Sequence, residues 1–300
     1  MNIASSALRT STSRYFSRLR LHDILVLQGP PLLGAAFAIT RLHARDAVSL
    51  LTLLAGNLFL MTHVFMLNDW AGLENDLADP NKARAVFTTR GIAASEIAAI
   101  SAGLLIVSLL LLSSVGRAAA GIALAIAALS ALYSLPPFHW KGRALLSSAT
   151  HLAGGILHFL LGYCVGHAID RRGVTIAVYF ALIFAAGHLT QEVRDHAGDA
   201  INRIGTNAVT FGPRRTFIAS LLLFTSANVI FLRLALDRMI PRPLAVVVVL
   251  FLFQIYWSFE VLRDGLTYTS VSRLQSRYRM LYAFIGVCIL AALAITRLSS

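Results

Sequence analysis

Two acidic stretches hold seven of the 14 acidic residues in this chain of 300 residues. The first reads NDWAGLENDLADPNK from position 68, and the second reads QEVRDHAGD from position 191. If each stretch is helical, Asn68, Asp69 and Asp76 share one face, and so do Asp195 and Asp199. Carboxylate and amide oxygens gathered in this way suit Mg²⁺, which usually binds protein through one or two carboxylates together with the phosphates of a substrate. Either stretch alone is equally consistent with a solvated loop.

A third polar stretch, YSLPPFHWKGR from position 133, follows a run of apolar residues. Pro136 and Pro137 end a helix there. Lys141 and Arg143 are either charges that set the membrane orientation or groups that reach a diphosphate, the lysine as a point charge and the arginine as a fork. Tyr133 lies where aromatic side chains commonly line a membrane interface. Taken alone, this stretch favours the simpler interpretation, in which Lys141 and Arg143 set the membrane orientation and Tyr133 is an ordinary interface aromatic.

The composition indicates a membrane protein. Hydrophobic residues make up 57% of the chain and charged residues only 13%, whereas roughly a quarter of the residues in soluble domains are charged. Apolar runs long enough to cross a hydrocarbon core of about 30 Å recur along the whole length. Pro30 and Pro31 interrupt the first run, which is tolerated only where protein surrounds the backbone. The sequence predicts an all-α integral membrane protein of about nine transmembrane helices, at residues 22–40, 47–67, 93–113, 117–134, 144–166, 173–190, 215–235, 242–262 and 279–297.

The basic residues indicate how the chain is oriented. With the N-terminus in the cytoplasm, 17 of the 26 basic residues lie on the cytoplasmic side, as the positive-inside rule requires. Both acidic stretches then lie on that side, four spans apart, which predicts two halves that each contribute one acidic loop over a central cavity. The 17 residues are Arg9, Arg14, Arg18, Arg20, Lys82, Arg84, Arg90, Lys141, Arg143, Arg194, Arg203, Arg214, Arg215, Arg263, Arg273, Arg277 and Arg279.

The formal net charge of +12 does not indicate a nucleic-acid-binding protein, because the basic residues lie between apolar runs rather than in one patch. Residues 1–20 contain no acid, and we expect them to form a basic cytosolic tail against anionic lipid. A transit peptide is the alternative. Residues 21–300 are expected to form a single transmembrane domain in the inner membrane of a bacterium. The sequence does not indicate an oligomeric state.

Six polar side chains fall inside the predicted spans, where they are costly unless they face the interior of the bundle. They indicate either a pocket for a substrate or hydrogen bonds between helices, and the second interpretation is the more common one for any single residue. They are Gln28, His63, His151, His158, His188 and Glu260.

Taken in order, the three polar stretches resemble the signatures of the UbiA superfamily of intramembrane prenyltransferases, and the resemblance covers about residues 20–295. In the first signature Asn68, Asp69 and Asp76 match, but Gly72 stands where a metal-binding aspartate is expected. The second signature matches at Asp195 and Asp199, and Gly205-Thr206 and Gly212 resemble its usual continuation. The segment from Tyr133 to Pro137, with Lys141, resembles the variant in branches that act on quinone, chlorin and lipid acceptors.

The resemblance implies an enzyme that binds a polyprenyl diphosphate through Mg²⁺ held by both acidic stretches. Loss of the diphosphate would give an allylic cation, which a small hydrophobic acceptor traps. The implied acceptor is an aromatic compound, a quinone precursor or a lipid. The implied metal ligands are Asn68, Asp69, Asp76, Asp195 and Asp199. The implied diphosphate-binding residues are Asn68, Lys141, Arg143 and Arg194. The implied catalytic residues are Asp69, Asp76, Tyr133, Lys141, Asp195 and Asp199.

Three other functions remain open on the sequence. A terpene cyclase of the same superfamily needs the same metals but no acceptor. A lipid-phosphate phosphoribosyl or glycosyl transferase is suggested by Asp76, Pro80 and Lys82, although the intact Asp195 and Asp199 pair is less typical of it. A cation-coupled transporter is disfavoured, because coupling sites usually lie near the midplane of the membrane rather than at its surface.

Overall fold

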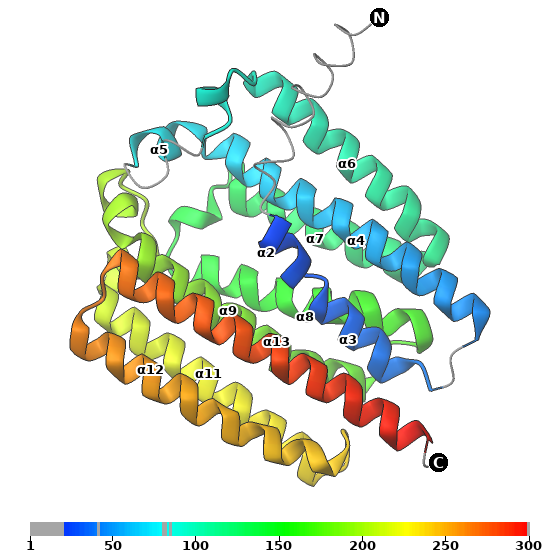
Figure 1. Ribbon diagram of the computed structural model, residues 1–300. Helices are drawn as coiled ribbons and strands as arrows, with labels where there is room; N and C mark the ends of the chain where they lie inside the picture. The colour runs from blue at the N-terminus through cyan, green and yellow to red at the C-terminus, as the bar shows by residue number, and fades with distance from the viewer. Residues whose placement is uncertain (1–20, 41–42, 80–82, 84–85, 299–300) are drawn as a thin grey trace, which may run out of the picture.

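A computed structural model describes residues 21–40, 43–79, 83 and 86–298 of the chain. The predicted basic tail at 1–20, and Pro80, Lys82 and Arg84 of the first acidic loop, lie outside these ranges. Within them the chain is helical and contains no β-strand, and its long helices run alongside one another (Figure 1). They are α4 (Ala44–Ala71), α6 (Ala94–Val115), α7 (Arg117–Ser134), α8 (Leu146–Gly166), α9 (Arg171–Ile201), α11 (Pro213–Leu236), α12 (Phe251–Asp264) and α13 (Tyr268–Leu298).

Eight helices among the described residues are long and apolar enough to cross a membrane. One of them, Arg242–Asp264, combines the 3-10 helix η4 (Arg242–Leu250) with α12. The first predicted span is the shorter apolar segment Asp23–Ala38. The all-α membrane fold is therefore confirmed, and the predicted nine spans correspond to eight long helices and one short, broken one.

The break divides the first span into α2 (Leu21–Val26) and α3 (Gly29–Ala38). Asn57 of α4 stabilises the turn between them, because its Nδ2 donates to the Leu27 carbonyl oxygen at 3.2 Å and to Gln28 Oε1 at 3.0 Å. His158 of α8 completes the network by donating from Nε2 to Asn57 Oδ1 at 2.9 Å. Two of the predicted intramembrane polar residues, Gln28 and His158, thus bind other helices.

Small residues allow α8 to pack closely against its neighbours, as is common where helices meet in lipid. A Cβ atom built on Gly155 would lie 2.7 Å from the Cα atom of Ala181 in α9. A side chain on Gly162 would collide with the backbone of Pro31 in α3. The close approach of α8 and α9 brings side chains one or two turns away into direct contact.

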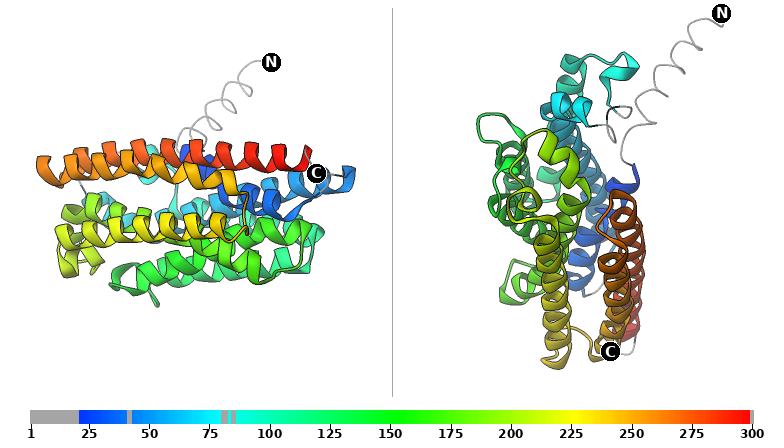
Figure 2. Two further views of the ribbon diagram at one scale, coloured as in Figure 1. Left: turned by 90° about the horizontal axis from the view of Figure 1, so that it is seen from below. Right: turned by 90° about the vertical axis from the view of Figure 1, so that its left-hand side faces the viewer.

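Short helices gather at one end of the bundle, opposite the C-terminal end of α13 (Figures 1 and 2). They are α5 (Leu73–Ala78), η2 (Thr88–Arg90), η3 (Trp140–Gly142) and α10 (Asn207–Phe211). The shared face of Asn68, Asp69 and Asp76 was predicted on the condition that the first acidic stretch is one continuous helix, and the structure does not meet this condition. Gly72 ends α4 and precedes α5, with φ −93° and ψ 6°, so the helix is interrupted at a residue of weak helix propensity.

Candidate active site

The first acidic stretch bends around Gly72. Asn68 and Asp69 lie in the last turn of α4, and Asp76 lies in α5; all three are half-buried. A Cβ atom built on Gly72 would lie 3.9 Å from Asp76 Oδ2 and 3.9 Å from Lys141 Nζ. The bend therefore keeps Asp76 close to the end of α4, and it brings Lys141 from the third polar stretch to the same place.

The second acidic stretch extends the long helix α9. Glu192, Asp195 and Asp199 are buried and follow Phe184 and His188 along one face of this helix. At a rise of about 1.5 Å per residue a helix of this length exceeds a hydrocarbon core of about 30 Å. The last turns of α9 consequently carry their carboxylates at one end of the bundle.

The two acidic stretches meet at this end. Asn202 Nδ2 donates to the carbonyl oxygen of Asn75 at 2.9 Å, which joins the residue after α9 to α5. The buried carboxyl group of Asp79 packs on Gly198, where an added Cβ atom would lie 2.7 Å from Asp79 Cγ. Gly198 leaves the space that Asp79 fills, between two of the predicted metal ligands. The sequence placed Asp79 among the acids of this loop but did not assign it to the site.

The third polar stretch joins the same end. Arg143 forms an isolated parallel bridge with Gly205, so η3 lies beside the loop that follows α9. Lys141 is half-buried, whereas Arg143 is exposed. Burial, and then the charges of Lys141 and Arg143, lower the pKa of His139. The turn is therefore a locally positive surface.

Tyr133 lies in the last turn of α7 and is half-buried. Its phenol group is within electrostatic range of Glu192, Asp195 and Asp199. Its ring meets that of His151 edge-on, with the centroids 5.0 Å apart. Tyr133 therefore lies between the second acidic stretch and α8.

Arg194 contacts α13 as well as the acidic stretch. Its Nε and Nη2 donate to the two carboxylate oxygens of Asp195 at 2.7 and 2.9 Å, and its Nη1 donates to Gln275 Oε1 at 2.8 Å. The guanidinium group also lies 5.7 Å from the ring centroid of Tyr268. Arg194 thus holds Asp195 in place and connects it to α13.

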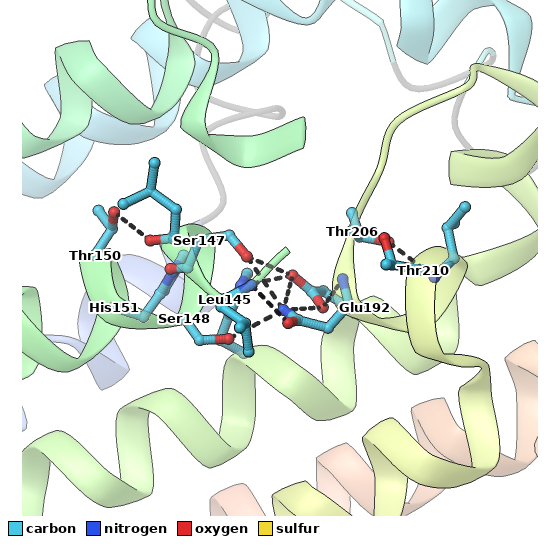
Figure 3. Close-up of polar contacts among 12 residues, drawn as sticks. Leu145, Ser147, Ser148, Thr150, His151, Glu192, Thr206 and Thr210 are labelled. Carbon is cyan, nitrogen blue, oxygen red and sulfur yellow. Dashed lines mark hydrogen bonds and ion pairs between the residues drawn. The ribbon is translucent and has the colours of Figure 1, made fainter. Parts of the chain in front are cut away.

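Glu192 is the centre of a buried network, which Figure 3 shows. It accepts hydrogen bonds from Ser147 Oγ and from the backbone N–H and side-chain Nδ2 of Asn207, each at 2.9 Å. Its Oε1 also lies 2.9 Å from His188 Nε2. Asn207 in turn accepts from the backbone N–H of Leu145 at 2.8 Å. The sequence did not single out this network, because its members are far apart along the chain.

The donor atoms fit Mg²⁺ better than a softer metal. Among the described residues, no three His, Cys, Asp or Glu side chains are placed to hold a metal ion by themselves. The oxygen atoms at this end instead divide into two groups, one around the α4–α5 bend and one on α9. Mg²⁺ suits such a site, because it keeps several waters and usually binds with the phosphates of a substrate.

Solved structures share this fold. A UbiA homologue from Archaeoglobus fulgidus with bound DMAPP and Mg²⁺ is 17% identical with a TM-score of 0.74, and the match covers 94% of this chain and 99% of that chain. An apo UbiA homologue from Aeropyrum pernix K1 is 16% identical with a TM-score of 0.69, over 92% and 98% of the two chains. A structure of digeranylgeranylglyceryl phosphate synthase is 15% identical with a TM-score of 0.69, over 94% and 98%.

At these identities the likeness establishes the fold alone. No curated protein sequence matches the chain at a significant level. The UbiA prenyltransferase family matches residues 29–270, a range that contains both acidic stretches and the turn between α7 and α8. This chain therefore belongs to the UbiA prenyltransferase family.

Proposed function

We propose that this protein transfers a polyprenyl group from its diphosphate to an aromatic, quinone-precursor or lipid acceptor within the membrane, with Mg²⁺ as the cofactor. The junction of the two acidic stretches carries the proposal: Asn202 binds the Asn75 carbonyl group, and Asp79 packs on Gly198. These contacts gather acidic side chains from two distant segments beside Lys141, at the end of an apolar bundle. A donor with a charged head and an apolar tail fits such a surface.

The proposed metal ligands are the oxygen donors on both sides of this junction. When bound there, Mg²⁺ neutralises the charge that develops on the diphosphate as it leaves. Structures of the A. fulgidus homologue with DMAPP and Mg²⁺ and with GPP and Mg²⁺ support the assignment. The ligands are Asn68, Asp69 and Asp76 from the first stretch, and Asp195 and Asp199 from the second.

The remaining residues of the site bind and shield the donor. Lys141 supplies a point charge beside Asp76, and Arg143 reaches the diphosphate from the aqueous side. Arg194 keeps Asp195 oriented and adds positive charge. The ring of Tyr133 excludes water from the allylic carbon, and its face favours a positive charge there.

The proposed reaction is tested with purified protein in lipid nanodiscs. The protein is incubated with Mg²⁺, with isoprenyl diphosphates of increasing chain length in turn, and with an aromatic, quinone-precursor or lipid acceptor. Diphosphate release and the mass of the product are measured. We expect release that depends on Mg²⁺ and a product that contains the acceptor. Release with a cyclic product and no acceptor would favour a terpene cyclase instead, and no release from any donor would contradict the proposal.

The metal assignment predicts the effect of removing one charge. Asp195→Asn and Asp199→Asn should each lower turnover by at least about a hundredfold, since loss of one key electrostatic group typically costs that much. Asp237→Asn, at the opposite end of α11 from Pro213, is the matched control. Near-normal turnover of both site variants would contradict a metal role for this stretch.

A further inference from the structure

We infer that His151 is the general base that takes up the proton released by the acceptor, and that His188 and Glu192 are the residues that position it. The inference rests on the proposed function, which requires an acceptor that loses a proton. It assigns a role to polar groups inside the bundle that neither donor binding nor metal binding uses. The three side chains contact one another in a row: Glu192 contacts His188, and His188 contacts His151.

Glu192 is fixed by its hydrogen bonds. Ser147 and Asn207 donate to its carboxylate oxygens, and these donors stabilise the charged form inside the bundle. His188 Nε2 lies 2.9 Å from Glu192 Oε1, and both side chains are buried. A histidine held by a fixed carboxylate is a recurrent arrangement in catalytic sites. Here that histidine is His188, and it positions the base His151 by stacking on its ring.

His151 stacks on His188. The two imidazole rings are 3.5 Å apart and inclined by only 7°. His151 Nδ1 lies 2.8 Å from the carbonyl oxygen of Ser147, which can only accept, so Nδ1 carries the proton and Nε2 carries the lone pair. Within the described part of the chain no residue forms a hydrogen bond with Nε2, and the side chain is only half-buried. The lone pair is therefore available to a substrate.

The position of His151 suits an acceptor beside the donor. Tyr133 contacts the His151 ring at 5.0 Å and is within electrostatic range of the acids on α9. Phe184 lies 5.4 Å from the same imidazole ring, on the side toward the middle of the bundle. The imidazole thus lies between an apolar region and the proposed diphosphate site, as a base for the acceptor must.

The hydrogen bonding of His151 differs from that of a histidine that joins two helices. The hydrogen bond of His151 is to Ser147, four residues earlier in its own helix, so it does not join two helices. His158, two turns along α8, does join them, because it binds Asn57 of α4. His151 packs on α7 and α9 through its ring, but its Nε2 atom is hydrogen-bonded to neither helix.

The proposed step is balanced in atoms and electrons. The C1–O bond of the donor breaks, and its electron pair leaves with the diphosphate. An electron pair of the acceptor forms the new bond to C1. The acceptor's proton moves to the lone pair on His151 Nε2. The electron pair that bound this proton stays on the acceptor. The resulting imidazolium is stabilised by the negative charge of Glu192 through the stacked His188, and it later passes the proton to water.

The first test separates transfer from donor ionisation. His151→Gln and the control His167→Gln, exposed at the other end of α8, are assayed in nanodiscs with geranyl diphosphate, Mg²⁺ and a panel of hydroquinone, 2-naphthol and 1,4-dihydroxynaphthalene. His151→Gln should lower kcat for transfer by about a hundredfold or more. The rate at which this variant releases diphosphate without acceptor should stay within about twofold of the wild-type rate. The rise in its melting temperature on addition of Mg²⁺ and inorganic pyrophosphate should also stay within about twofold of the wild-type rise.

The second test is chemical rescue. Added imidazole should restore transfer by His151→Ala, whereas pyrrole, a ring of the same size without a basic nitrogen, should not. Glu192→Gln, which keeps the shape but removes the charge, should lower kcat with little change in KM. Rescue by both rings would assign His151 to packing and overturn the inference.

The outcomes distinguish this inference from the proposed function. If His151→Gln releases diphosphate and also transfers the prenyl group as fast as wild type, the inference is overturned and the proposed function stands. Loss of pyrophosphate stabilisation together with transfer would also overturn it, because the variant would then have a structural defect. Wild-type protein that transfers to no member of the panel overturns it too, and wild-type protein that never releases diphosphate overturns the proposed function itself.

Discussion

Gly198 is the residue on which the junction of the two acidic stretches depends. It lies on α9 between Asp195 and Asp199, and the carboxyl group of Asp79 occupies the space beside it. Alanine has a higher helix propensity than glycine by roughly 1 kcal/mol, so propensity alone would favour a substitution here. The contact with Asp79 opposes it, because an added Cβ atom needs the same volume.

Gly198→Ala should therefore weaken the site without weakening the fold. We expect the affinity for pyrophosphate in the presence of Mg²⁺ to fall on the order of tenfold, which corresponds to about 1.4 kcal/mol. Isothermal titration calorimetry with the protein in nanodiscs measures this. Gly103→Ala is the matched control, since a Cβ atom there meets nothing within 4 Å. Equal affinities of the two variants would show that Asp79 does not contribute to the site.

Gly72 allows a second test at the residue scale. Its φ of −93° is open to any L-residue. A Cβ atom would lie 3.0 Å from the carbonyl oxygen of Asn68, which is a tight contact, and 3.9 Å from both Asp76 Oδ2 and Lys141 Nζ. Gly72→Asp should lower the Mg²⁺ concentration needed for half-maximal activity, because an added carboxylate strengthens a site for a hard cation. Gly72→Ala separates the effect of the charge from that of the bend. Loss of activity in both variants at every Mg²⁺ concentration would mean that the position needs an open backbone.

Individual acids could be recognised from the sequence, but their contacts could not. The four-residue spacing of Asp195 and Asp199 predicts that they share a face of one helix, and both lie on α9. The positions of Asp79 and Glu192 depend on where α5 and α10 pack, which no local spacing encodes. The local sequence around Asp79 shows only an acid directly before Pro80, and this does not predict its contact with Gly198.

Element boundaries were predictable where hydrophobicity changes sharply. Long apolar runs gave the spans, since each must bury or expose a continuous apolar length. The α4–α5 bend was missed because the residues around Gly72 have enough helix propensity to continue, and Gly72 itself is tolerated in many helices. The contact that fixes α5 is distant in sequence: Asn202, the residue after α9, donates to the carbonyl oxygen of Asn75.

The broken first span makes a prediction at the scale of elements. Asn57→Leu removes the donor to Leu27 and Gln28 and the acceptor of His158, so α2, α3 and α8 lose their common partner. The free energy of unfolding should fall by about 1–3 kcal/mol, because buried polar groups are left without hydrogen bonds.

Thermal unfolding in detergent, followed by tryptophan fluorescence, measures this change. Thr225→Val is the control, because the Thr225 hydroxyl is exposed on α11 and donates only to its own helix. A stability of Asn57→Leu equal to that of the control would contradict the structural role assigned to this network.

The whole molecule makes a prediction about orientation. If the acidic end faces the cytoplasm, Ala200 near the end of α9 and Ala168 before its start lie on opposite sides of the membrane. In a variant that lacks Cys164 and Cys288, Ala168→Cys should react with a membrane-impermeant maleimide in intact cells. Ala200→Cys should react only after the membrane is opened. Labelling of Ala200→Cys from outside would overturn both the orientation and a cytoplasmic active site.

Helix α9 has a consequence for how the active site tolerates change. Its functional side chains, from Phe184 through His188 to Asp199, lie along one face of a single helix. Their relative positions therefore depend on the number of residues between them. A substitution within this helix alters one group, but an inserted residue rotates everything beyond it by about 100° and shifts it by about 1.5 Å. One extra alanine after Leu189 would turn both aspartates away from the imidazoles while leaving every side chain intact. This family member should therefore tolerate a single substitution in α9 better than any change in the length of α9 between His188 and the two aspartates.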